Sequence, residues 1–209
     1  MRLLFLMVAW PIISALVYIA VPVPFSNLML FRLFSGNGLD KSWRGLDQLS
    51  PQLARAVVAA EDQRFCAHHG VDWTEFKDAW ASGERGASTI PMQVAKNLYL
   101  WEGRSVVRKG LELPLAFYLD SVWSKRRMME IYLNIVEWGP GVYGAEAAAQ
   151  YHFGKSAAQL SAHEAALLAA SLPNPIIRVA GTPSAGVKAL AAHIQSQMLE
   201  IDGHLACLK

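Results

Sequence analysis

The stretch "VVAAEDQRFCAHHGVDW", residues 57–73, begins as an apolar helical run and ends in acids, a histidine pair and a glycine. A helix that starts near Leu53 places Glu61 close to its C-terminal end. There the helix dipole opposes negative charge and the neighbouring alanines and valines limit solvation, so both effects raise the pKa of a carboxyl group. Glu61 is therefore a candidate general base near neutral pH, and the alternative is a surface glutamate that only ends the helix. Gly70 is expected to supply a positive φ angle in the following loop.

Beyond residue 50, the apolar residues recur mostly at helical spacing, with few runs of alternating polarity. We find no repeat, low-complexity tract or second domain, so the sequence predicts one mainly α domain over residues 51–209. Helix start signals stand at Ser50-Pro51, at Asp72 with Glu75 and at Ser161 with Glu164, and a stop signal stands at Pro173-Asn174-Pro175.

The N-terminal segment differs from this domain in composition. Leu3 to Val23 contains no charged residue and has about the 20 residues needed to cross a bilayer, which predicts a transmembrane anchor over residues 1–24. A cleaved signal peptide is the competing interpretation. Residues 25–50 form a juxtamembrane segment, whose run "LMLFRLF", residues 28–34, suits a membrane surface and a protein core equally well. The flanking charges leave the orientation of the anchor open.

A second informative stretch is "GERGASTIPMQVAKNLYL", residues 83–100. Its first part is small and flexible, and its second part places Gln93, Lys96 and Asn97 on one helical face at spacings of three and four. This is a polar face that carries a cation. An ordinary solvated surface is the alternative.

A third stretch, "WEGRSVVRKGLELP", residues 101–114, is rich in cations. Arg104, Arg108 and Glu112 recur at every fourth residue and would line one side of a helix, with Lys109 three residues before Glu112. Three cations beside one carboxylate exceed what pairing requires and suit a phosphate or diphosphate, although an exposed charged face remains an alternative. Pro114 is expected to kink such a helix, which leaves the alignment of Glu112 open.

The two cysteines, Cys66 and Cys207, are too few to indicate a metal site or a disulfide framework. They lie far apart in the sequence and do not determine the redox compartment. The simplest interpretation is two ordinary buried thiols, and whether they pair is left open.

Four blocks follow one another along the chain: "EDQRFCAHHGVD", "GASTIPMQVAKNLYL", "RKGLE" and "RRMMEIYLNIVEWGPGVYGAEAAAQYHFGK". In this order they resemble the motifs of the peptidoglycan glycosyltransferase family, the transglycosylase domain shared by bifunctional penicillin-binding proteins and by single-domain membrane-anchored enzymes. No Ser-x-x-Lys set of a transpeptidase follows, so the chain most resembles the monofunctional members. The resemblance implies a mainly α, lysozyme-like fold with a large lobe and a smaller membrane-embedded jaw.

The resemblance also implies a reaction. The acceptor would be lipid II and the donor a growing glycan chain on undecaprenyl diphosphate. Glu61 matches the family's catalytic glutamate, which deprotonates the 4-hydroxyl of the acceptor GlcNAc so that it attacks the anomeric carbon of the donor MurNAc. Inversion gives a β-1,4 linkage and undecaprenyl diphosphate leaves. Lipid II is polymerised outside the cytoplasmic (inner) membrane, so the resemblance implies a catalytic domain on the outer face of that membrane, with a single-pass anchor and a cytoplasmic N-terminus.

The remaining site residues follow from the same match. Glu112 matches the second glutamate, which orients basic residues, binds sugar or helps to hold a divalent cation such as Mg or Mn; no other cofactor is implied. The positions that match substrate contacts are Lys96, Arg104, Arg108 and Lys109 for the diphosphate, and Ser88, Gln93 and Asp62 as polar contacts, with loop hydrogen bonding as the alternative for Asp62. The fourth block, with Glu130, Tyr132 and Asn134, is expected to support the site. Met92 stands where the family commonly has a first glutamine, and Pro91 and Pro114 are unusual at their positions.

Three other functions compete with this one. A lysozyme-like glycan-cleaving enzyme also uses carboxyl groups, but it has no diphosphate to hold and so does not account for the cations. A nucleotide-sugar transferase would need a glycine-rich phosphate loop after a strand, which the sequence lacks. A non-catalytic membrane scaffold would not need the intact charged residues. The expected partners are lipid-linked glycan, the cytoplasmic membrane and cell-wall synthesis or division proteins, with no nucleic acid.

Overall fold

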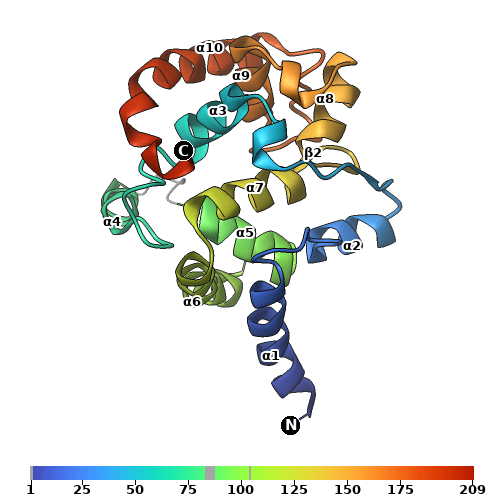
Figure 1. The fold of residues 1–209 in the computed structure, drawn as a ribbon, viewed down its shortest axis with the longest axis vertical. Helices are drawn as coiled ribbons and strands as arrows, with labels where there is room; N and C mark the ends of the chain where they lie inside the picture. Colours follow the sequence, from blue (N-terminus) through green and yellow to red (C-terminus); the bar gives the residue numbers. More distant parts are fainter. Residues whose placement is uncertain (1, 83–87, 104) are drawn as a thin grey trace.

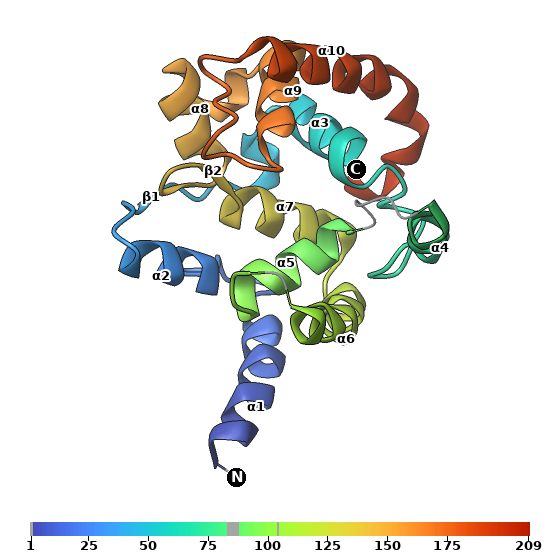
Figure 2. The ribbon, with the colours of Figure 1, turned by 180° about the vertical axis from the view of Figure 1, so that it is seen from behind.

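The computed structural model describes residues 2–82, 88–103 and 105–209, and the chain in these ranges is mainly helical (Figure 1). The helices form two groups that share a hydrophobic core. Figure 2 shows the same two groups from behind, with the N-terminal helix projecting from one end of the molecule. The predicted mainly α class is therefore confirmed, and it fits a lysozyme-like transglycosylase domain.

The first group consists of α3 (Pro51–Glu61), α9 (Ala162–Ser171) and α10 (Ala185–Glu200), with α8 (Ala145–Phe153) beside them (Figures 1 and 2). α3 packs against both α9 and α10. Fully buried small side chains on the facing helices, including Ala56 and Ala166, let the helices approach closely. This packing holds the C-terminal end of α3, where Glu61 is the last helical residue.

The predicted start signals of these helices are found with one difference. Ser161 and Glu164 form the reciprocal capping box at the start of α9. Ser50 takes the N-cap position of α3 before Pro51, but its hydroxyl donates to the backbone oxygen of Leu160 (2.7 Å). The side chain thus ties the start of α3 to the segment before α9 and does not cap its own helix.

The second group consists of α5 (Ile90–Tyr99), α6 (Val106–Val122) and α7 (Lys125–Ile135), and α5 packs against both of the others. Pro91 lies in the first turn of α5, where a missing N–H leaves no hydrogen bond unmade. Pro114 lies inside α6, and the helix continues through it. Glu112 therefore keeps its alignment with Arg108, which the sequence had left open.

The N-terminal segment forms α1 (Arg2–Val17) and α2 (Asn27–Phe34). The C-terminal end of α1 is attached to the second group, because the indole N–H of Trp123 donates to the Ala15 oxygen (2.8 Å). α1 ends six residues before the end of the apolar run that predicted an anchor. Among the residues that the structure describes, no helix combines the length and the apolar character needed to cross a membrane. The predicted transmembrane helix is thus not confirmed.

The helix α2 is partly buried in the protein core and partly exposed on the surface, whereas the sequence suited either a core or a membrane surface. Met29 is fully buried, whereas Leu30, Phe31, Leu33 and Phe34 are exposed, and Phe34 reaches 87 % exposure. One face of α2 therefore packs in the core and the other presents apolar side chains outward.

A small sheet joins the N-terminal segment to the middle of the chain. Strands β1 (Asp40–Lys41), β2 (Glu137–Gly139) and β3 (Val142–Tyr143) are ordered β1-β3-β2, with β1 parallel and β2 antiparallel to β3. Gly141, in the β2–β3 turn, has φ +70°, and a Cβ there would lie 2.2 Å from the Gly38 oxygen. Only glycine fits this turn.

The loop after α3 leads into α4 (Trp73–Ser82), and it is held in two ways. Gly70 has φ +74° as predicted, and Asp72 accepts hydrogen bonds from the backbone N–H groups of Thr74 and Glu75 at the start of α4.

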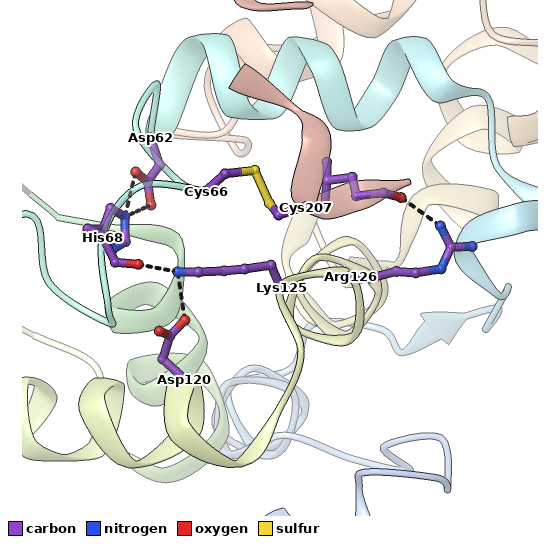
Figure 3. The surroundings of a disulfide bond; sticks show 8 residues. Asp62, Cys66, His68, Asp120, Lys125, Arg126 and Cys207 are labelled. Atoms are coloured by element: carbon purple, nitrogen blue, oxygen red, sulfur yellow. Dashed lines mark hydrogen bonds and ion pairs between the residues drawn. A yellow bond between two sulfur atoms is a disulfide. The ribbon is translucent and has the colours of Figure 1, made fainter. Parts of the chain in front are cut away.

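The interpretation of the cysteines as ordinary thiols is wrong, because Cys66 in this loop forms a disulfide with Cys207 (Figure 3). The C-terminal turn, Ala206–Leu208, returns to lie against the loop across a separation of 141 residues, a contact that no local pattern reveals.

Candidate active site

Glu61 lies where the two groups of helices meet, at the end of α3. Burial raises the pKa of its carboxyl group above the ordinary value, and the nearby Asp62 acts in the same direction. The Gln93 hydrogen bond and the charges of Lys96 and Arg178 oppose this shift without cancelling it. The direction is the one that the sequence predicted, and the main cause is burial between helices.

Two hydrogen bonds connect Glu61 to the second group of helices. The Gln93 side-chain N–H, on α5, donates to Glu61 Oε2 (2.7 Å). The Tyr132 hydroxyl, on α7, donates to Gln93 Oε1 (3.0 Å). The predicted polar residue Gln93 is thus a direct neighbour of the predicted base, and Tyr132 supports it from the core.

An open cleft of about 500 Å³ lies beside Gln93. Gln93, Lys96 and Asn97 line it from α5, as their shared helical face predicted. Arg108 and Arg32 add two further cations from α6 and α2. The remaining lining is Leu28, Leu100, Trp101, Glu102, Gly103, Val136, Glu137, Leu172, Pro173 and Pro175.

Lys96 is a partly buried cation that lines the cleft from α5. Burial lowers the pKa of its ammonium group, while the charge of Glu112 counteracts this effect and that of Arg108 adds to it. Within the described ranges, its ammonium group makes no hydrogen bond or ion pair with another side chain. A partly buried cation without a close counter-ion is the arrangement that an anionic ligand would complete.

Glu112 sits between two cations on α6. Its side chain is 3 % exposed, and it forms ion pairs with Arg108 through Oε1 and with Lys109 through Oε2 (3.0 Å). Lys109 also donates to the Ser88 hydroxyl (2.7 Å). The structure thus brings Ser88, Arg108, Lys109 and Glu112 together, whereas Arg104, predicted to belong to the same set, lies outside the described residues.

Asp62, the residue after Glu61, has contacts within the fold. It is buried, accepts a hydrogen bond from the Ile90 N–H (2.9 Å) and lies 2.9 Å from His68 Nε2 (Figure 3). These contacts tie the end of α3 to the start of α5. Asp62 also lines a second hollow, of about 220 Å³, together with Glu61 and Ser88, so a substrate contact for it stays a prediction.

Three residues near the site were not among the predicted ones. Arg32 on α2 reaches Glu102 and Glu137, with both N–O distances 3.1 Å, and joins the N-terminal segment to the cleft. Arg178, from the segment after α9, contributes charge near Glu61. Tyr132 was assigned only to general support. Their partners lie tens of residues away, so no motif spacing could have revealed them.

The fourth sequence block supports the site, as predicted. Glu130 accepts a hydrogen bond from the Leu46 N–H (3.0 Å) and pairs with Arg127. The Asn134 amide exchanges hydrogen bonds with the backbone of Arg44 (2.9 and 2.8 Å). These contacts fix α7 against the segment that enters α3.

The described residues contain no group of three or more His, Cys, Asp or Glu side chains that could hold a metal ion. Both carboxylate oxygens of Glu112, a candidate ligand by resemblance, are occupied by cations. A divalent cation at this site stays a prediction.

Comparison with known proteins places this chain in a family. Residues 29–198 match the model of the family described as Transglycosylase. A biosynthetic peptidoglycan transglycosylase of Agrobacterium fabrum is 52% identical over 203 residues, which cover 91% of this chain and 90% of the relative. A protein of the same name from Rhizobium meliloti is 54% identical, and the match covers 88% of this chain and 80% of the relative. Another, from Rhodopseudomonas palustris (strain TIE-1), is 56% identical, and the match covers 81% of this chain and 74% of the relative. The chain therefore belongs to the transglycosylase family.

Proposed function

We propose that the chain polymerises lipid II into β-1,4-linked glycan strands, with inversion at the MurNAc anomeric carbon and release of undecaprenyl diphosphate. Its family membership makes it a peptidoglycan glycosyltransferase, and the substrates and stereochemistry are what this proposal adds. The observation that carries the proposal is the position of Gln93, which hydrogen-bonds to a carboxyl group of raised pKa and lines a cleft that contains Lys96. A base next to a cationic cleft suits a transfer in which a diphosphate leaves.

Glu61 is the proposed base. Its carboxylate takes the proton from the 4-hydroxyl of the acceptor GlcNAc as that oxygen attacks the anomeric carbon of the donor MurNAc. Because burial raises the pKa of the Glu61 carboxyl, its ionised form is a stronger base than an exposed glutamate would be.

The cleft cations are the proposed site of the diphosphate. Negative charge builds up on the leaving group as the bond to the anomeric carbon breaks, and preorganised cations stabilise that charge. Lys96 has no close counter-ion among the described residues, so it is available for the diphosphate. Arg108 and Lys109 share one carboxylate, Glu112, which holds them in place and leaves a net positive charge. We assign Arg104 to the same anion site from the sequence match.

We also propose a membrane location. Residues 1–24 would anchor the chain, residues 25–50 would lead from the membrane, and residues 51–209 would form the catalytic domain on the outer face of the inner membrane. The exposed apolar face of α2, with Phe31 and Phe34, supports contact with lipid next to the cleft that Leu28 and Arg32 line. The Cys66–Cys207 disulfide supports an extracytoplasmic, oxidising compartment.

A divalent cation has no clear place in this scheme. Since the described residues hold no metal-ligand cluster and Glu112 is already paired with two cations, we derive no step through a metal.

The test is polymerisation of labelled lipid II by the full chain in detergent, with lysozyme digestion of the product. Glu61→Gln should abolish lysozyme-sensitive polymer. Glu200→Gln is the matched control, because Glu200 is also the last residue of a helix but is exposed, and it should leave polymerisation unchanged. A folded wild type that makes no polymer and cleaves finished glycan would overturn the proposal in favour of a hydrolase.

A further inference from the structure

A buried tyrosine hydrogen-bonds to Gln93, the neighbour of the proposed base. Tyr132 is fully buried on α7, and its hydroxyl donates to Gln93 Oε1 (3.0 Å). The other end of the same amide donates from Nε2 to Glu61 Oε2 (2.7 Å). The three side chains come from three helices, α7, α5 and α3, so the chain of hydrogen bonds spans the junction between the two groups of helices.

The hydroxyl matters because a glutamine side chain is nearly symmetric in shape. Rotation by half a turn exchanges its N–H donors for its oxygen acceptor, and the exchanged form would place an oxygen against the Glu61 carboxylate. The Tyr132 hydroxyl disfavours this exchange, because its buried proton would lose Gln93 Oε1 as its acceptor. Burial raises the pKa of the Tyr132 hydroxyl well above its ordinary value, so it keeps its proton and remains a donor.

We propose that Tyr132 is a positioning residue for the transfer: it holds the Gln93 amide so that Nε2 occupies Glu61 Oε2 and leaves Oε1 to receive the proton of the acceptor hydroxyl. This inference rests on the proposed function. None of the described residues donates a hydrogen bond to Glu61 Oε1. The two oxygens of the carboxylate are therefore unequal before substrate binds.

The acceptor O–H bond breaks, and its proton moves to Oε1 while the oxygen lone pair forms the new bond to the anomeric carbon. The bond from that carbon to the diphosphate oxygen breaks, and its electron pair leaves with the diphosphate. Throughout, Nε2 of Gln93 donates to Oε2, so the amide does not have to reorient as the charge leaves Glu61.

Other charges also act on the base. Lys96 on α5 and Arg178 after α9 favour the carboxylate, and Asp62 next to it in the chain disfavours it. Removal of the Tyr132 hydroxyl leaves these three charges in place, so a change in the pKa of Glu61 would report the orientation of the Gln93 amide.

Tyr132→Phe removes one oxygen and keeps the ring in the core. The carboxylate loses an oriented donor, so its pKa should rise, and the acid limb of the rate against pH should move up by about one pH unit, so that kcat at a fixed pH on that limb falls about tenfold. KM for lipid II should stay within about twofold. Tyr99→Phe is the matched control, since that hydroxyl contacts Ser14 on α1, away from Glu61, and the pH profile should not move.

A double-mutant cycle separates positioning from a general loss of packing. Gln93→Met removes the amide, so adding Tyr132→Phe to it should lower kcat by less than twofold more. A full further tenfold loss would show that Tyr132 does not act through Gln93, and an unchanged acid limb in the single variant would also overturn the proposal.

Failure of the proposed function gives a different result. If the wild type makes no polymer, the Glu61 carboxyl can still be titrated by its infrared band, identified by its loss in Glu61→Gln. A higher midpoint in Tyr132→Phe would then support the positioning role, and an equal midpoint would refute it.

Discussion

The disulfide between Cys66 and Cys207 should make a large contribution to stability, and Cys66→Ser/Cys207→Ser tests it. The bond closes a loop over a sequence separation of 141 residues. The chain-entropy relation gives about 5 kcal/mol at 25 °C for a loop of this length, because the cross-link removes conformations from the unfolded chain. This is comparable to the whole free energy of unfolding of a typical domain, which is about 5–15 kcal/mol.

The assay is unfolding in guanidinium chloride, followed by tryptophan fluorescence of the full chain in detergent. With a slope of about 4–5 kcal/mol per molar, the loss should lower the midpoint by about 1 M. Reducing agent should shift the wild type to the same midpoint and should not shift the double variant, which serves as its control.

Two results would refute this reasoning. One is an equal midpoint for oxidised wild type and double variant. The other is quantitative thiol labelling of both cysteines in protein isolated from an oxidising compartment, because the bond would then not form. A linked peptide that contains both residues, seen by mass spectrometry without reduction, would confirm the pairing.

Three further predictions follow from the site and from one turn. Lys96→Met should lower kcat about a hundredfold or more, because it removes a cation from the leaving group, and Lys96→Arg should recover part of it; equal activity of Lys96→Met and wild type would contradict the diphosphate assignment. Because the pKa of Glu61 is raised in the folded state, its ionisation costs stability as the pH rises through that pKa, so Glu61→Gln should unfold at a higher temperature than wild type at pH 8, with a gap that closes on acidification; a constant gap would show that charge is not the cause. Gly154→Ala should destabilise the fold by about 1–2 kcal/mol because Gly154 has a positive φ, and Gly141→Ala should destabilise it by more because a Cβ at Gly141 would also meet the Gly38 backbone oxygen. Thermal unfolding of the two variants checks this, and equal losses of stability would contradict it.

Several features of the site are local in the sequence and could be predicted. The place of Glu61 at the end of a helix depends on residues within two turns of it, and the cap joins Ser161 to Glu164, three positions later. Arg108 and Glu112 are four residues apart and meet on α6. Helical periodicity reports such contacts because one helix generates both partners.

Other features depend on segments that are far apart and could not be predicted. The strands of the small sheet have only two or three residues, too few for a pattern of alternating polarity, and β1 pairs with a strand about a hundred residues later. Arg32 was assigned to a surface or core helix, and its pairing with Glu137 appears only when α2 folds against the cleft.

By itself, the sequence determined the mainly α class, the family motifs and the residue types that could serve as base and as anion site, because periodicity, capping and motif order are properties of neighbouring residues. Only the tertiary structure decided that Tyr132 holds Gln93 against Glu61, that Lys96 is left without a close counter-ion among the described residues, and that the two cysteines pair. The physical reason is that burial and long-range hydrogen bonds depend on which helices pack together, and packing across tens of residues leaves no periodic trace in the chain.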